Sequence, residues 1–180
     1  MKDSSNIILI GFMGTGKTAV GKRLASILNM EFFDTDQEIE KVTGMSIARL
    51  FQKHGEIRFR SEEAIMIKKL SEKRNTIIAT GGGIVLNTEN IEILRDTGYI
   101  ICLTAKPDVI YERVKRRNNR PLLKKGDTYA NILTLLEERE EFYKCADFSV
   151  DTSEMDFEEI ISEILKFITE KRKNKKINNQ

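Results

Sequence analysis

The sequence predicts an α/β fold, a three-layer αβα sandwich in which a five-stranded parallel sheet lies between helices. Short apolar runs alternate along the chain with segments that repeat apolar residues at helical spacing, a pattern typical of parallel sheets. The runs are almost continuously apolar, as expected for strands covered on both faces. The 180 residues are 40% hydrophobic and 32% charged, which is ordinary for a globular protein. We therefore expect a single domain over residues 1–180.

The first part of the chain contains two expected strands. Residues 7–10 form a short apolar run, and residues 17–28 repeat apolar side chains every three or four positions, as in an amphipathic helix. A second short strand, 31–33, leads into two aspartates. A further helix begins at Gln37.

The middle of the chain continues the alternation. Two helical stretches are expected over 46–54 and 55–73, followed by a strand over 76–79 that leads into three glycines. Residues 86–96 have the pattern of another helix. We expect Gly98 to end this helix as its C-cap, because glycine adopts the left-handed conformation found there.

The last part of the chain completes the sheet. The run 99–103 predicts a fourth strand, and helical stretches follow over 107–117 and 127–144. Residues 148–151 predict a fifth strand. An amphipathic helix over 157–171 closes the fold.

The strongest functional signal is residues 11–18, with the sequence Gly-Phe-Met-Gly-Thr-Gly-Lys-Thr. This fits the P-loop pattern, and it lies between an expected strand and an expected helix, as the motif requires. A glycine-rich turn with an incidental Lys-Thr is disfavoured by that context. Lys17 is expected to reach the β- and γ-phosphates, and the Thr18 hydroxyl to ligate Mg²⁺. Phosphate contacts are expected from Gly14, Thr15, Gly16, Lys17, Thr18 and Ala19.

Two carboxylates follow the second strand, Asp34 and Asp36. Ligands in open α/β sheets gather beyond the carboxyl ends of strands, so this position favours a functional role. The alternative is that Asp36 caps the following helix. Capping explains one aspartate of the pair but not both.

Three other features have both a functional and a structural interpretation. The glycines 81–83 leave the backbone open to close approach, which favours a ligand over a simple turn. Arg60 lies in a dense block of charged residues, and such blocks are usually solvated helix faces. The basic segment 113–126 contains Pro and Gly, and is either a mobile lid over phosphates or an ordinary solvated loop.

The charge distribution and the cysteines exclude several classes of protein. The net charge is +2, and basic side chains are concentrated in residues 170–180, which we expect to be a flexible tail. The rest of the chain is slightly acidic, which argues against a domain that binds nucleic acid. No apolar stretch approaches the roughly 18 residues of a membrane span, and the two cysteines have no ligand spacing. We expect a cytoplasmic protein.

Taken together, the motifs closely resemble those of shikimate kinases, small P-loop kinases related in fold to nucleoside monophosphate kinases. The matching features run in the family's order over most of the chain. They are the P-loop, the aspartate pair, Gly55-Glu56, Phe59-Arg60 with Glu63, the glycines 81–83, Arg120-Pro121-Leu122-Leu123, and Arg139 with Tyr143. The resemblance implies a P-loop kinase fold with a mobile lid, ATP and Mg²⁺ as cofactors, and transfer of the γ-phosphate to the 3-hydroxyl of shikimate. It also suggests a monomer.

The resemblance further implies an acceptor site. Asp36 would hold the ring hydroxyls of shikimate and draw the proton from the attacking hydroxyl. Arg60 and Arg139 would clamp the substrate carboxylate, and forked guanidinium groups suit that task. The backbone at Gly82 and Gly83 would approach the ring hydroxyls.

On the donor side, the resemblance implies that Lys17 and Arg120 act on the triphosphate as catalytic residues. Asp34 would act on the Mg²⁺ side with Thr18, Arg113 would lie against the adenine, and Glu63 would orient Arg60.

Two other functions compete with this interpretation. A kinase of another small hydroxy acid, such as gluconate, would share the P-loop and the size. A regulatory nucleotide-binding module would have little use for the acceptor motifs. A GTPase is excluded, because the Asn-Lys-x-Asp and Asp-x-x-Gly motifs do not occur.

Overall fold

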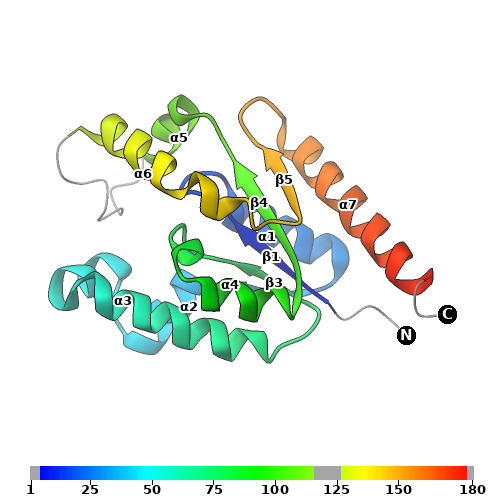
Figure 1. Cartoon of the computed structure of the whole chain (residues 1–180), viewed down its shortest axis with the longest axis horizontal. Helices are drawn as coiled ribbons and strands as arrows, with labels where there is room; N and C mark the ends of the chain where they lie inside the picture. Colours follow the sequence, from blue (N-terminus) through cyan, green and yellow to red (C-terminus); the bar gives the residue numbers. More distant parts are fainter. Residues whose placement is uncertain (1–4, 116–126, 178–180) are drawn as a thin grey trace.

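The computed structural model describes residues 5–115 and 127–177, and shows a five-stranded parallel sheet between two layers of helices (Figure 1). The strands are β1 (Asn6–Ile10), β2 (Glu31–Asp34), β3 (Thr76–Ala79), β4 (Gly98–Thr104) and β5 (Phe148–Asp151). The helices are α1 (Lys17–Leu28), α2 (Thr35–Thr43), α3 (Ile47–Ser71), the short 3₁₀ helix η1 (Ile84–Leu86), α4 (Thr88–Arg95), α5 (Pro107–Val114), α6 (Thr128–Tyr143) and α7 (Phe157–Ile177). The predicted α/β class is confirmed.

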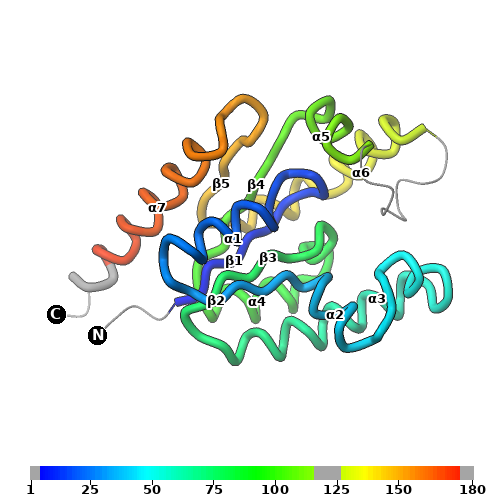
Figure 2. Tube along the Cα trace, turned by 180° about the vertical axis from the view of Figure 1, so that it is seen from behind, coloured from blue at the N-terminus to red at the C-terminus, as the bar shows by residue number. Residues whose placement is uncertain are grey.

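The side chains of β1 alternate between the two faces of the sheet, and a different layer of helices covers each face. Ile7 and Leu9 pack into a core with α1 and α7, whereas Ile8 and Ile10 pack into a second core with α3 and α4. In Figure 2, α7 lies to the left of the strands and α3 to their lower right. All four of these strand side chains are fully buried, as expected for a strand without a solvent face.

The strand order is β2-β3-β1-β4-β5, so β1 is central. Ile8 of β1 is paired with Ile78 of β3 on one side and with Ile100 of β4 on the other. Because all strands are parallel, the loops that follow β1, β2 and β3 meet at one edge of the sheet. The P-loop, the aspartate pair at the junction of β2 and α2, and the three glycines all lie at this edge.

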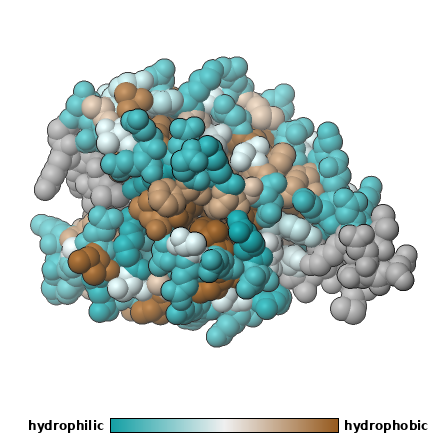
Figure 3. Space-filling view, in the orientation of Figure 1, coloured by the Kyte–Doolittle hydropathy of each residue, from teal (hydrophilic) through white to brown (hydrophobic). Residues whose placement is uncertain are grey.

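The space-filling view shows the hydropathy of one face of the molecule. Most of the face in Figure 3 is hydrophilic, and its hydrophobic residues gather toward the middle. Within the described residues, no helix is long and apolar enough to cross a membrane.

The prediction of one helix over residues 86–96 was wrong in detail. Residues 84–86 form η1, and α4 begins after Asn87, whose side chain accepts hydrogen bonds from Glu89 N and Asn90 N. Gly98 does not cap α4 but begins β4. A Cβ at Gly98 would lie 2.0 Å from the carbonyl oxygen of Asn6, so glycine is needed for close strand pairing.

The two helical stretches expected on either side of Gly55 form one α3 with a break. Gly55 has φ 77° and ψ 177°, which is not helical. Helix α5 ends at Val114, so most of the segment 113–126, including Arg120, lies outside the described residues. Helix α7 extends to Ile177 and thus includes most of the basic segment 170–180.

Candidate active site

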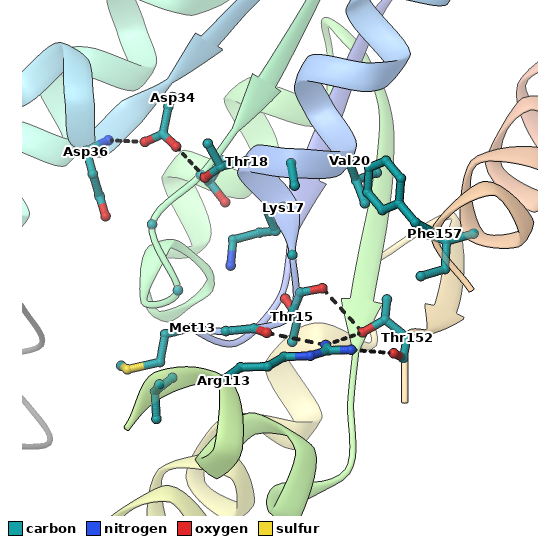
Figure 4. Close-up of a pocket in the computed structure, with 18 of the residues that line it drawn as sticks. Met13, Thr15, Lys17, Thr18, Val20, Asp34, Asp36, Arg113, Thr152 and Phe157 are labelled. Atoms are coloured by element: carbon teal, nitrogen blue, oxygen red, sulfur yellow. Dashed lines mark hydrogen bonds between the residues drawn. The ribbon is translucent and has the colours of Figure 1, made fainter. Parts of the chain in front are cut away.

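A cavity of about 530 Å³ lies at the carboxyl edge of the sheet. Figure 4 shows Thr18, Asp34 and Asp36 toward one end of it and Thr152 and Phe157 toward the other. The lining residues are Met13, Gly14, Thr15, Gly16, Lys17, Thr18, Ala19, Val20, Asp34, Asp36, Thr80, Gly81, Gly82, Glu112, Arg113, Val114, Thr152, Phe157 and Ile160. The P-loop and the aspartate pair therefore share one cavity, as the sequence predicted.

Positive φ angles allow the P-loop to wrap around an open space. Gly14 and Gly16 have φ of 85° and 99°, values that residues with a Cβ rarely adopt. No atom lies within 4 Å of the position of a Cβ at Gly16. Helix α1 begins at the next residue, so its N-terminal N–H groups face the same region. This is the geometry of an anion-binding site.

Lys17 lies inside the loop rather than in solvent. Its Nζ donates hydrogen bonds to the carbonyl oxygens of Gly11 at 2.7 Å and Phe12 at 2.9 Å. Thr15 also donates to Phe12 O, at 2.8 Å. The ammonium group is thus held at the floor of the cavity by neutral acceptors.

The two aspartates have different places in the structure. Asp34 Oδ2 accepts a hydrogen bond from Thr18 Oγ1 at 2.7 Å, and Asp34 Oδ1 accepts from the backbone N–H groups of Asp36 and Gln37 at 3.1 and 3.3 Å. Asp34, and not Asp36, is therefore the N-cap of α2. The side chain of Asp36 lines the cavity instead.

The three glycines are required for close approach and not for unusual backbone angles. A Cβ at Gly81 would lie 2.6 Å from Glu63 Oε1 and 2.9 Å from Asp36 Oδ1. A Cβ at Gly83 would lie 2.4 Å from Arg60 Nη1. The groups that approach this loop closely are therefore side chains of the protein, and they are themselves candidate site residues. The sequence had suggested that a ligand approaches the loop.

Arg60 is not part of a solvated helix face, so that interpretation was wrong. Its Nη1 donates to Glu63 Oε2 at 2.6 Å, and its Nε and Nη2 donate to Glu56 Oε1 at 3.2 and 2.8 Å. Its guanidinium carbon lies 5.3 Å from the centre of the Phe59 ring. These contacts fix the guanidinium group beside Gly83.

Arg139 reaches the same loop from α6 and is only 3% exposed. Its Nη1 donates to the carbonyl oxygen of Gly82 at 3.2 Å, and Tyr143 Oη donates to the same oxygen at 2.7 Å. The buried Nε of Arg139 has no hydrogen-bond partner among the described residues. Buried donors are normally paired, so this N–H indicates a place for a ligand atom.

Arg113 lies at the other end of the cavity. Its guanidinium group donates to Thr152 O at 2.7 Å, to Thr152 Oγ1 at 2.9 Å and to Gly14 O at 3.4 Å, as Figure 4 shows. Phe157 and Ile160 line this end as well. These two residues come into the cavity from the start of α7, which the periodicity predicted only as an amphipathic helix that closes the fold.

The carboxyl group of Glu63 has an altered proton affinity. Burial raises its pKa from 4.5 to about 7, and Arg60 opposes the shift. Asp36 raises the pKa further and Arg139 lowers it. Glu63 is therefore a buried carboxyl group that titrates near neutral pH.

A phosphate-binding loop with carboxylate and guanidinium groups around one cavity is the arrangement of a P-loop kinase that phosphorylates a small molecule. A family model described as shikimate kinase matches residues 13–169, and the chain belongs to the shikimate kinase family. A shikimate kinase from Pelotomaculum thermopropionicum is 55% identical over 165 residues, which are 92% of this chain and 96% of that protein.

Solved structures agree with this assignment. A shikimate kinase from Acinetobacter baumannii in complex with shikimate has a TM-score of 0.89 at 34% identity, over 93% of this chain and 94% of that one. A gluconokinase from Sinorhizobium meliloti has a TM-score of 0.62 at 15% identity, over the full length of both chains. The second likeness concerns the fold alone.

We predict that Glu63→Gln flattens the pH dependence of stability. Between the unfolded pKa of 4.5 and the folded value of about 7, the folded state binds more protons at Glu63. The free energy of unfolding of the wild type should therefore fall as the pH rises through this window. The variant does not titrate there, so it should gain on the wild type by up to about 1.4 kcal/mol per pH unit.

Urea unfolding at pH 5, 6, 7 and 8 measures this difference. Glu137→Gln, on the exposed face of α6, is the matched control. A difference between Glu63→Gln and wild type that stays constant over this range would contradict the prediction.

Proposed function

We propose that this protein transfers the γ-phosphoryl group of ATP to the 3-hydroxyl of shikimate, giving shikimate 3-phosphate and ADP. The observation that carries this is the position of Asp36 and Arg60, which both pack against the glycines 81–83 beside the P-loop. An acceptor that binds these groups has its hydroxyl next to the phosphate cradle. Proximity of this kind is the main contribution of kinases to phosphoryl transfer.

The donor would bind along the P-loop. The N–H groups around Gly16 would hold the phosphates, and Lys17 would exchange its two carbonyl partners for phosphate oxygens. Arg113 would contact the adenosine end, where it is held by Thr152. Arg120 lies outside the described residues, and its action on the triphosphate remains a prediction.

The oxygen atoms at the N-terminus of α1 are suitable ligands for Mg²⁺. The Thr18 hydroxyl and an Asp34 carboxylate oxygen are 2.7 Å apart at the cavity wall. Hard oxygen donors from one hydroxyl and one carboxylate, completed by phosphates and water, are what Mg²⁺ prefers. When bound, Mg²⁺ neutralises charge on the phosphates.

The acceptor would be held by its carboxylate and its ring hydroxyls. Arg60 and Arg139 would bind the carboxylate, and the backbone of Gly82 and Gly83 would face the ring. Asp36 would accept the proton of the attacking hydroxyl group as its oxygen bonds to the γ-phosphorus. The bond between that phosphorus and the bridging oxygen then breaks, and its electron pair leaves with ADP.

The wider setting follows from the same proposal. A small-molecule kinase needs no nucleic acid or membrane partner, and we propose that the chain works as a single-domain monomer in the cytoplasm. Its product would serve aromatic amino-acid biosynthesis.

The proposed activity is tested by ADP formation from Mg-ATP with shikimate, with gluconate, or with no acceptor. We expect release that depends on shikimate, because Asp36 lines the cavity and the guanidinium groups of Arg60 and Arg139 contact the glycine loop beside it. Release without an acceptor, or with gluconate alone, would leave the P-loop assignment intact and overturn the acceptor site.

Asp36→Ala should lower kcat by roughly 10²- to 10⁴-fold, the usual contribution of a general base. ATP binding should be nearly unchanged, because Asp34 and not Asp36 bonds Thr18. Calorimetric titration with a nonhydrolysable ATP analogue checks the second point. Normal turnover in this variant would remove Asp36 from its role.

Gly83→Ala should weaken shikimate binding while leaving the fold intact. The added methyl group would lie 2.4 Å from Arg60 Nη1, and the flexible end of Arg60 can move where a backbone atom could not. Losing one charged hydrogen bond to the substrate predicts a KM for shikimate roughly tenfold higher or more.

The KM for ATP and the thermal midpoint serve as internal controls for Gly83→Ala. Adding Gly83→Ala to an Arg60→Ala variant should cost little more, because the two changes act on one contact. Additive losses would show that Gly83 acts in some other way.

A further inference from the structure

Tyr143 and Arg139 are four residues apart at the end of α6, so they lie on the same face of the helix, one turn apart. Both side chains donate to one backbone oxygen, that of Gly82, from Tyr143 Oη at 2.7 Å and from Arg139 Nη1 at 3.2 Å. A carbonyl oxygen has two lone pairs and can accept both bonds. The hydroxyl bond is the shorter of the two.

The Gly82 carbonyl group is in turn part of the loop that faces the P-loop. A Cβ at Gly82 would lie 3.1 Å from Met13 N and 3.5 Å from Gly11 O. The loop therefore has little room to shift toward the phosphate cradle. The bond from Tyr143 holds its carbonyl group toward α6, on the side where Arg139 lies.

The position of the Gly82 carbonyl group affects the orientation of the Arg139 guanidinium group. Its Nη1 is bonded to Gly82 O, and the ring of Phe12 lies 5.7 Å from its guanidinium carbon. The Nε atom is buried and has no hydrogen-bond partner among the described residues. The guanidinium group is planar, so its bond to Gly82 O and its contact with the Phe12 ring together restrict the direction of the Nε–H bond.

We propose that Tyr143 is a positioning residue for the carboxylate of the acceptor substrate. Its hydroxyl holds the Gly82 carbonyl group as the acceptor for Arg139, and so aims the unbonded edge of the guanidinium group into the acceptor site. This inference rests on the proposed function, because it assigns the carboxylate of shikimate to that edge. Tyr143 does not touch the substrate and acts through Arg139.

A purely structural role for Tyr143 makes different predictions. Its ring packs at the junction of two hydrophobic clusters, one containing Phe12 and Ile132 and the other containing Ile84. A phenylalanine at this position keeps the packing and removes only the hydroxyl. Tyr143→Phe therefore separates the two roles.

The experiment compares Tyr143→Phe with wild type and with Tyr129→Phe. Tyr129 is on the same helix, and its hydroxyl donates to Asp108 at 2.6 Å on the exposed surface. We expect Tyr143→Phe to raise the KM for shikimate about three- to tenfold, the loss typical of one neutral hydrogen bond. The kcat and the KM for ATP should stay within about twofold, and Tyr129→Phe should match wild type.

The decisive measurement uses a shikimate analogue in which a hydroxymethyl group replaces the carboxylate. Wild type and Tyr143→Phe should have the same kcat/KM for this analogue, because it cannot use the oriented edge of Arg139. In an Arg139→Lys background, Tyr143→Phe should add less than twofold to the KM for shikimate.

The proposal is overturned if the KM for shikimate is unchanged, or if the analogue and shikimate lose equally. It is also overturned if the KM values for shikimate and ATP rise together with a lower thermal midpoint, which is the result of a structural role. Failure of the proposed function itself would appear earlier, as wild-type protein that forms no ADP in response to shikimate.

Discussion

The acceptor side of the site depends on how closely side chains can approach the loop after β3. The positions that Cβ atoms would occupy at Gly81 and Gly83 are taken by Glu63, Asp36 and Arg60. Helices α2 and α3, which carry these side chains, come after β2 in the chain, but the side chains approach the loop that follows β3. Without glycines, neither helix could bring its charged groups to the carboxyl edge of the sheet. The glycines of this loop thus allow the charged groups to lie close together beside it.

Whether the sequence predicts a site residue depends on how far apart in the sequence its contacts are. The P-loop was predictable because strand, loop and helix adjoin in the sequence, and the motif specifies a local backbone geometry. Asp34 and Asp36 were located at the right strand end, but the roles in helix capping were reversed. Both residues are near the helix start, and only the side-chain geometry decides which carboxylate turns back to the backbone N–H groups.

Arg60 and Gly98 show where local patterns are insufficient. Periodicity assigns a charged helical residue to solvent, because it contains no information about the loop that the helix meets. Likewise, Gly98 follows a helix at a distance typical of a C-cap, yet it is needed for contact with Asn6, which is far away in the sequence. Arg60 was assigned by family resemblance, since resemblance includes long-range constraints that composition and spacing do not contain.

Three cations in the cavity wall, or at the glycine loop beside it, donate hydrogen bonds to backbone carbonyl groups. Lys17 is bonded to the carbonyl oxygens of Gly11 and Phe12, Arg139 to that of Gly82, and Arg113 to those of Thr152 and Gly14. A carbonyl group orients a cation without bringing a full negative charge to it.

Arg60 differs from these cations, because it is bonded to Glu56 and Glu63. Glu56 offsets part of its positive charge, and the second partner offsets less. Burial raises the pKa of the Glu63 carboxyl to about 7, so at neutral pH this partner is only partly ionised. A chain that is slightly acidic outside its C-terminal segment can thus attract a triphosphate and a carboxylate to one cavity. The attraction comes from local pairing chemistry rather than from net charge.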